Sequence, residues 1–162
     1  MVRQVLCGHA ALPYHGKRQG ITMLDYDIDT LVPHRRPLRL IDEVLAVDGD
    51  AAETAAVVTP EWPTFAAGAA DALVMIELVA QTAAVIGGYK ALTGSSGSSP
   101  RKGMLVGIKQ ADFMVASLPG GTRIVTRATT RPLLENFKQI HGIVTIDKQV
   151  VGKMILQGVQ SA

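Results

Sequence analysis

The chain has 162 residues, 48% of them hydrophobic and 4% aromatic, and its 16 basic and 14 acidic residues leave a net charge of +2. This composition favours one folded domain and excludes a chain that is disordered throughout, and it lacks the clustered basic residues with interleaved aromatics that are typical of nucleic-acid binding. Cys7 is the only cysteine, so no internal disulfide can form, no metal site or other cofactor is indicated, and a reducing cytoplasm is the expected location.

The N-terminal residues resemble a targeting segment only weakly. They contain one arginine and a short apolar run, but His9 interrupts that run and no small-residue cleavage site follows it cleanly. A more convincing domain sequence begins at Met23. The sequence therefore predicts a flexible extension over residues 1–22 and a single domain over residues 23–162.

The first part of this domain alternates turns with strand-like segments. The pattern predicts a helical turn, a proline-bracketed turn, two strands of a hairpin and a loop, over residues 25–31, 33–37, 39–47, 52–58 and 61–70. His34 lies in the turn that Pro33 and Pro37 bracket. An Asp-Gly step at Gly49 supplies the tight reversal between the two strands.

Residues 70–92 are predicted to form one long helix, with Asp71 as its N-cap. The stretch is apolar almost all the way round, which places such a helix in the interior of a water-soluble protein. Glu77 and Gln81 interrupt the apolar run four residues apart, so they share one face. Burial of an ionised carboxylate is costly unless it is paired, hydrogen-bonded or protonated, which makes Glu77 a candidate functional residue. These polar residues and the paired glycines near the end of the helix argue against a membrane span.

The second half of the chain is predicted to contain only strands after a flexible Gly/Ser loop over residues 93–101. Four strand-like segments lie at residues 104–115, 123–130, 137–147 and 150–159. Short connections between them favour a largely antiparallel sheet. A helix that is apolar on every side needs cover on every side, which a strongly curved sheet and a second subunit would provide.

Four stretches of the chain resemble a known family. They are LVPHRRPLRLIDEV (residues 31–44), MIELVAQ (75–81), LPGGTRIVTRA (118–128) and DKQVVGKMIL (147–156). In order, they resemble the Pro-His-Arg-x-Pro turn, the Glu-x-x-Ala-Gln helix, the Pro-Gly-Asp-x-Leu strand start and the closing hairpin of the 3-hydroxyacyl-acyl carrier protein dehydratases and their short predicted-dehydratase relatives. The resemblance implies an α+β hotdog fold, in which an antiparallel sheet of about six strands wraps around one long central helix.

The resemblance also implies an assembly and a function. Hotdog sheets pair edge to edge, so a homodimer, a dimer of dimers or a heterodimer with a paralogue is expected. The implied activity is dehydration of 3-hydroxyacyl thioesters in fatty-acid or polyketide-type synthesis. Two alternatives stay open: an inactive dehydratase-like subunit that binds acyl chains or completes a heterodimer, and a hotdog thioesterase.

One family motif is missing. The dehydratases have a His-Phe-Pro-Gly motif about fourteen residues ahead of the helical Glu, and its His acts with the Glu of the partner subunit. In this chain that position is Pro63, and no His lies between His34 and His141. The short relatives also lack the motif and keep the Pro-His-Arg turn, so the resemblance implies the acyl-carrier context more directly than it implies a complete site.

Dehydration requires a base for the α-proton, an acid for the leaving hydroxyl and donors for the developing enolate oxygen. Glu77 suits the acid, because burial would favour its protonated form. His34 is the candidate base and Gln81 could orient Glu77. The backbone N–H groups of Ala72 and Leu73, at the start of the helix, are the candidate donors for the thioester carbonyl.

A set of basic residues is the candidate docking surface for an acyl carrier protein or a coenzyme A thioester. The set comprises Arg35, Arg36 and Arg39 of the Pro-His-Arg turn, together with Arg101 and Lys102. Such a rim would attract an acidic carrier and the phosphate of its phosphopantetheine arm. An ordinary solvated surface is the alternative interpretation.

Overall fold

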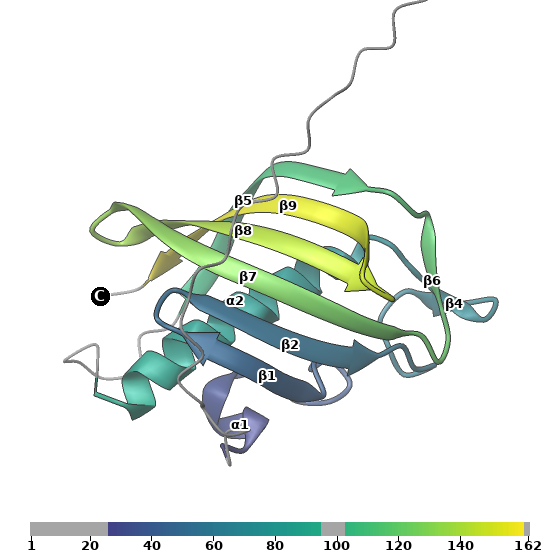
Figure 1. Ribbon diagram of the computed structural model, residues 1–162, viewed down its shortest axis with the longest axis horizontal. Coiled ribbons are helices and arrows are strands. Elements are labelled where there is room, and N and C mark those ends of the chain that lie inside the picture. The colour runs from purple at the N-terminus through teal and green to yellow at the C-terminus, as the bar shows by residue number, and fades with distance from the viewer. Residues whose placement is uncertain (1–25, 95–102, 161–162) are drawn as a thin grey trace, which may run out of the picture.

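The computed structural model describes residues 26–94 and 103–160 (Figure 1). The predicted extension over residues 1–22, most of the Gly/Ser loop, and the basic residues Arg101 and Lys102 lie outside these ranges. Within the described ranges, none of the helices is both long enough and apolar enough to cross a membrane.

Six strands form one antiparallel sheet in the order β1-β2-β7-β8-β9-β5. They are β1 (Glu43–Asp48), β2 (Ala51–Val57), β5 (Gly103–Phe113), β7 (Arg123–Leu134), β8 (Phe137–Ile146) and β9 (Gln149–Gln160). Every neighbouring pair runs antiparallel. The prediction of a six-stranded antiparallel sheet is therefore confirmed, although β1 begins at Glu43 rather than at Arg39.

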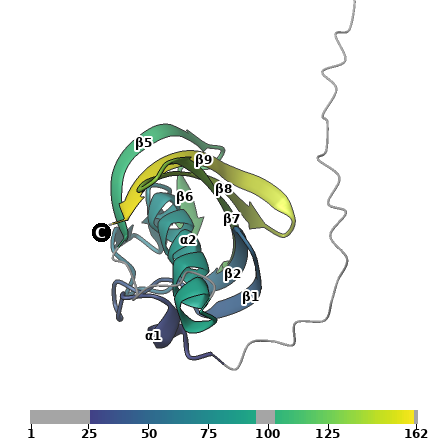
Figure 2. The same cartoon turned by 90° about the vertical axis from the view of Figure 1, so that its left-hand side faces the viewer.

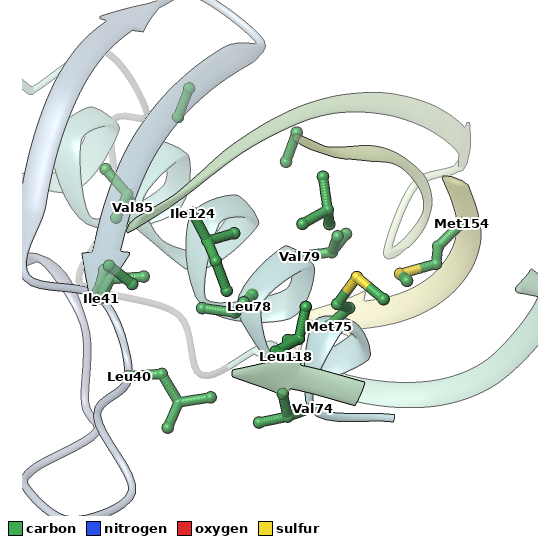
Figure 3. Packing of buried hydrophobic residues seen from close by; sticks show 14 of the residues in the cluster. Leu40, Ile41, Val74, Met75, Leu78, Val79, Val85, Leu118, Ile124 and Met154 are labelled. Atoms are coloured by element: carbon green, nitrogen blue, oxygen red, sulfur yellow. The ribbon is translucent and has the colours of Figure 1, made fainter. Parts of the chain in front are cut away.

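The sheet curls around α2 (Val74–Leu92), which lies along its concave side (Figure 2). Residues from both the helix and the strands fill the core, and among the most completely buried are Met75, Leu78, Leu118, Ile124 and Met154 (Figure 3). A buried aliphatic side chain of this size contributes about 1.5–3 kcal/mol. Burial on most sides of α2 thus explains why its sequence has no single apolar stripe.

The helix starts later than the sequence predicted. Leu73 is the N-cap and no side chain caps it. The N–H of Met75 donates to the carbonyl of Ala72, and the N–H of Ile76 to that of Leu73, so the first turn has the tighter i→i−3 pattern. Asp71 is not the helix N-cap; its Oδ1 accepts from the N–H of Leu73 at 2.8 Å and caps this preceding turn.

A second, three-stranded sheet lies where the sequence predicted a loop. It consists of β3 (Phe65–Ala66), β4 (Ala69–Asp71) and β6 (Ser117–Pro119), in that order. Ala67 and Gly68 form the β3–β4 turn with φ of 50° and 86°, the left-handed values that a two-residue hairpin turn requires. This hairpin delivers the chain to the start of α2.

The short helix α1 (Ile28–Leu31) packs across the C-terminal half of α2. The two backbones approach so closely that a Cβ at Gly88 would lie 2.1 Å from the carbonyl oxygen of Leu31. On another side of α2, the hydroxyls of Thr54 and Thr82 are buried and lie 2.7 Å apart. Thr82 also donates to the carbonyl of Leu78. These contacts fix α2 against both α1 and the sheet.

Candidate active site

His34 and Glu77 meet at the surface between the Pro-His-Arg turn (residues 33–40) and α2. The Nε2 atom of His34 lies 3.4 Å from Oε1 of Glu77, and the two side chains are 34% and 43% exposed. The turn follows α1 directly, and the contact of α1 with Gly88 holds it beside the helix. Two candidate residues that lie 43 positions apart in the chain are therefore brought together.

Glu77 is more exposed than the sequence predicted. The expected burial followed from the apolar residues around it, but its side chain remains 43% exposed in the single chain. The sheet covers the opposite side of α2, where Leu78 and Val79 are fully buried. Glu77 instead points to the side that the Pro-His-Arg turn only partly covers, so its burial would need a further chain or a ligand.

Gln81 is fully buried and links the helix to the turn. Its Nε2 donates to Oε1 of Glu77 at 2.8 Å and to the carbonyl oxygen of Leu38 at 2.7 Å. Its Oε1 accepts from the N–H of Leu40 at 2.9 Å. Since a buried amide is costly unless it is hydrogen-bonded, these three bonds define the positions of both the carboxylate and the turn.

A pocket of about 430 Å³ opens beside this pair. It is lined by His34, Leu38, Leu40, Pro63, Thr64, Leu73, Val74 and Glu77. The Pro-His-Arg turn, the segment before β3 and the first turns of α2 thus form three walls, and each wall bears one polar side chain. An apolar cavity with a few polar groups suits an acyl chain with a reactive polar end.

The two N–H groups expected to serve as oxyanion donors already have partners within the chain. The N–H of Ala72 donates to the carbonyl oxygen of Ala116 at 3.1 Å. The N–H of Leu73 donates to the carboxylate of Asp71. A role for either N–H group towards a thioester carbonyl would require it to share or exchange these bonds.

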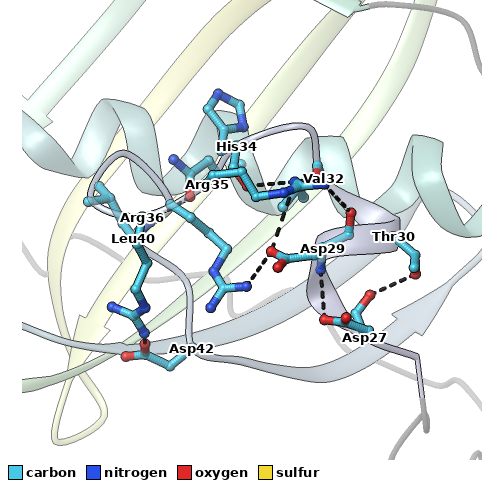
Figure 4. A network of polar contacts seen from close by, with 11 residues as sticks. Asp27, Asp29, Thr30, Val32, His34, Arg35, Arg36, Leu40 and Asp42 are labelled. Atoms are coloured by element: carbon cyan, nitrogen blue, oxygen red, sulfur yellow. Dashed lines mark hydrogen bonds and ion pairs between the residues drawn. The ribbon is translucent and has the colours of Figure 1, made fainter.

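The three arginines of the turn each contact a carboxylate (Figure 4). Arg39 and Arg36 lie 2.5 Å from carboxylate oxygens of Asp29 and Asp42 respectively. Arg35 donates to the backbone oxygens of Val32, His34 and Asp29. Their charges are therefore largely balanced within the chain, and these contacts stabilise the turn that carries His34.

Sequence reasoning missed the polar group on the third wall. Thr64 lies in the segment predicted as a loop, next to Pro63, the position at which the spacing of the dehydratase motif predicted a His. Only the spacing from Glu77 pointed to this segment, and it gave no reason to single out a threonine. The side chains of Leu38 and Leu73, which are 60% and 57% exposed, form an apolar part of the pocket lining that was also missed.

Two charged pairs outside the pocket each lower the pKa of a carboxyl group. A hydrogen bond from Arg123 lowers the pKa of Glu43, and a hydrogen bond from Lys90 lowers the pKa of Asp50. The first pair links β1 to β7 across β2, and the second links the end of α2 to the β1–β2 turn. Among the residues that the structure describes, no group of three or more His, Cys, Asp or Glu side chains could hold a metal ion.

The curved antiparallel sheet around one long helix is the hotdog fold, and solved structures of that fold resemble this one. The dehydratase heterocomplex ApeI:P from Xenorhabdus doucetiae matches 83% of this chain and 91% of its own, with a TM-score of 0.73 and 20% identity. The E. coli PaaI protein from the phenylacetic acid degradation operon matches 74% of this chain and 79% of its own, with a TM-score of 0.56 and 11% identity.

The sequence comparisons identify the family. Residues 26–160 match the ApeP-like family, described as ApeP dehydratase, and the chain belongs to that family. A 3-hydroxyacyl-[acyl-carrier-protein] dehydratase, FabZ, from Solibacter usitatus (strain Ellin6076) is 27% identical over 138 residues, which cover 79% of this chain and 83% of the relative. The function of this chain is therefore dehydratase-like, and the resemblance inferred from the four motifs is confirmed.

Proposed function

We propose that this protein dehydrates 3-hydroxyacyl thioesters, using Glu77 and His34 at the mouth of the apolar pocket. The observation that carries this proposal is the 3.4 Å contact between His34 Nε2 and Glu77 Oε1 beside that pocket. The pair unites an imidazole, which can accept a proton as a base, with a carboxyl group, which can donate one as an acid. The name of the relative from Solibacter usitatus supports the same reaction.

In the proposed mechanism, His34 takes the α-proton of the bound thioester, and Glu77 in its protonated form gives a proton to the departing 3-hydroxyl. The C–O bond breaks, water leaves and a double bond forms between the α and β carbons. The reaction leaves His34 protonated and Glu77 ionised. Exchange of protons with water at this partly exposed pair then restores neutral His34 and protonated Glu77.

Gln81 positions Glu77 for this role. Its Nε2 donates to Oε1 of Glu77, so the same oxygen faces both Gln81 and His34. The other carboxyl oxygen can then carry the proton that the leaving hydroxyl receives. Gln81 itself is fully buried and takes no part in proton transfer.

We propose an acyl carrier protein or coenzyme A thioester as the substrate and a dimer as the working unit. The pair is one-third to nearly one-half exposed, and the neighbouring Leu38 and Leu73 are more exposed still. β5 is the last strand of its sheet, and no described strand pairs with its second edge. A homodimer, a dimer of dimers or a heterodimer with a paralogue would cover both features. We further propose that the carrier docks on Arg35, Arg36 and Arg39. The proposed location is the cytoplasm, and the proposed role is in fatty-acid or polyketide-type synthesis.

A second candidate function is that of a non-catalytic subunit in a heterodimer. The observation that favours it is Pro63, which lines the pocket at the position where the His-Phe-Pro-Gly motif of the 3-hydroxyacyl-acyl carrier protein dehydratases would place a His. The resemblance to the ApeI:P heterocomplex, a dehydratase of two different chains, is compatible with this function. Thioester hydrolysis is a third possibility, since a helical Glu beside an apolar pocket also suits that reaction.

Mass spectrometry of a 3-hydroxyacyl carrier protein incubated with this protein separates the three functions. Loss of one water from the acyl group is the expected result. Release of the free acid would show a thioesterase. An unchanged substrate with the protein alone, at concentrations where it is dimeric, would contradict catalysis by this chain and favour the subunit function.

A further inference from the structure

The wall of the pocket before β3 carries a polar side chain that the proposed mechanism does not use. Thr64 lines the pocket together with His34 and Glu77. Its backbone has a φ of 69°, in the left-handed region. This conformation is unusual for a β-branched residue, and such outliers concentrate at functional sites and ligand clamps. Thr64 is therefore a candidate for a role in ligand binding.

The hydroxyl of Thr64 has a proton to offer. Its Oγ1 accepts a hydrogen bond from the N–H of Asp71 at 3.2 Å. A hydroxyl can accept two hydrogen bonds and donate one, so this contact leaves its donor capacity unused. Among the described residues, the structure shows no acceptor for that proton. The exposed hydroxyl can thus donate to a molecule in the pocket while Asp71 holds its oxygen in place.

The proposed reaction needs a donor of this kind. Removal of an α-proton moves negative charge onto the thioester carbonyl oxygen, which a fixed hydrogen-bond donor stabilises. The N–H groups of Ala72 and Leu73 donate to Ala116 and Asp71 instead. His34 and Glu77 are occupied by proton transfer. Thr64 is the remaining polar side chain among the pocket-lining residues.

We propose that the Thr64 hydroxyl donates the hydrogen bond that binds the carbonyl oxygen of an acyl thioester in this pocket. The inference rests on the proposed function for its choice of ligand, but it does not require turnover, because an unreactive thioester presents the same carbonyl. Thr64 then acts as a substrate-binding residue whose bond strengthens as charge develops on the oxygen.

The binding test uses two ligands and two variants. The ligands are a saturated acyl pantetheine thioester and the matching S-alkyl pantetheine, in which a methylene replaces the carbonyl. Thr64→Val keeps the branched shape and removes the hydroxyl, whereas Thr64→Ser keeps the hydroxyl. In titration calorimetry we expect Thr64→Val to weaken thioester binding about 3- to 10-fold and to leave thioether binding unchanged, as loss of one hydrogen bond predicts. Thr64→Ser should bind both ligands like the wild type.

Turnover provides a second measurement. With a 3-hydroxyacyl carrier protein, Thr64→Val should lower kcat about 100-fold and change KM less than tenfold, because the bond matters most when the oxygen is charged. A residue that only stabilised the β3–β4 hairpin would not produce this separation of kcat from KM. If circular dichroism shows that Thr64→Val is unfolded, Thr64→Ala replaces it as the variant without a hydroxyl.

Three binding results would overturn the inference: wild-type protein that binds neither ligand, equal losses for thioester and thioether in Thr64→Val, or a Thr64→Ser variant that behaves like Thr64→Val. Failure of the proposed function would look different. In that case the wild type would show Thr64-dependent thioester binding and yet leave the 3-hydroxyacyl substrate unchanged. Conversely, full dehydration by a folded Thr64→Val variant would remove the role of Thr64 and retain the proposed function.

Discussion

Gln81 holds Glu77 in place from one helical turn further along α2, with 2.8 Å between Gln81 Nε2 and Glu77 Oε1. The same amide is bonded to the backbone of Leu38 and Leu40, so one side chain joins the helix wall of the pocket to the turn wall. Any change at Gln81 should therefore affect stability and the site together.

Replacement of Gln81 by Leu should destabilise the protein by about 2–4 kcal/mol. The change leaves the buried N–H of Leu40 without its partner, which costs about 1–3 kcal/mol, and it also removes the part-buried bond to the carbonyl of Leu38, which costs less. Urea unfolding would measure the loss. Gln110→Leu is the control, since Gln110 is exposed on β5 and should change the free energy of unfolding by less than about 0.5 kcal/mol. Equal effects of the two changes would contradict the structural role of Gln81.

Glu77→Gln should reduce dehydration about 10²–10⁴-fold and leave the fold intact, because an amide keeps the shape and cannot donate a carboxyl proton. Turnover of a 3-hydroxyacyl carrier protein is the measurement, with circular dichroism as the check on folding. Glu61→Gln is a matched control, because Glu61 is exposed and does not line the pocket. Full turnover in Glu77→Gln, with a melting temperature shifted by several degrees, would refute the assignment of Glu77 as the acid.

His34→Gln should reduce turnover by a similar factor if His34 is the base. Its Nδ1 is buried without a partner, so the fold should lose little when the ring is replaced. His141→Gln is the matched control, because His141 lies in β8 and contacts Gln139 rather than the pocket. Wild-type turnover in His34→Gln as well as in the control would show that His34 is not the base, and another residue, such as one from a second chain, would have to take that role.

Adjacent glycines in α2 should respond to alanine with opposite signs. A Cβ at Gly88 would lie 2.1 Å from Leu31 O, so Gly88→Ala must push α1 and the Pro-His-Arg turn away and should cost about 1–3 kcal/mol. A Cβ at Gly87 meets nothing within 4 Å, and Gly87→Ala should stabilise the helix by up to about 1 kcal/mol. Thermal unfolding of both variants tests this. Similar shifts for the two variants would mean that α1 does not rest on Gly88.

Asp50 should contribute to acid sensitivity. The hydrogen bond from Lys90 lowers the pKa of Asp50 below its ordinary value of 3.8. A lowered pKa in the folded state stabilises the fold at pH values above the ordinary pKa, and this contribution is lost as the pH falls through the lowered pKa. In Asp50→Asn the free energy of unfolding should therefore fall less steeply as the pH is lowered. The difference should be about 0.5 kcal/mol or less, because the Asp50 side chain is 62% exposed.

Lys90→Gln, alone and combined with Asp50→Asn, provides the control for this prediction. Lys90→Gln removes the donor of the same hydrogen bond, so it should reduce the pH dependence of the free energy of unfolding as Asp50→Asn does. Combining the two substitutions should add little further change. Additive effects of the two substitutions would indicate that the contact does not shift the titration of Asp50.

Much of the fold was predictable because its signals are local. The all-round apolarity of residues 74–92 requires burial, and the alternation of the later strands, with their short turns, requires an antiparallel sheet. The β3–β4 hairpin was missed because its strands are only two and three residues long and three of their five residues are alanine, which gives no alternating pattern. The start of α2 was misplaced because Asp71 can cap an i→i−3 turn as readily as a helix.

The candidate site was predictable as a set of residues but not as an arrangement. The four-residue spacing of Glu77 and Gln81 already places them on one face. The contact between Glu77 and His34 depends on how α1 crosses α2, which no local pattern encodes. Pairing of the N–H groups of Ala72 and Leu73 likewise depends on Ala116, which is distant in sequence, and on Asp71.

The hydrogen bonds of Gln81 and Thr82 determine how α2 is rotated about its own axis. A helix that is apolar on all sides gains nearly the same burial energy at any angle about its own axis, so hydrophobic packing alone specifies that angle poorly. Gln81 bonds to the Pro-His-Arg turn, and the neighbouring Thr82 bonds to Thr54 of β2. Since these two residues point about 100° apart around the helix, only one rotation satisfies both. Apolar residues therefore stabilise α2 inside the sheet, while two buried polar side chains determine which way Glu77 faces.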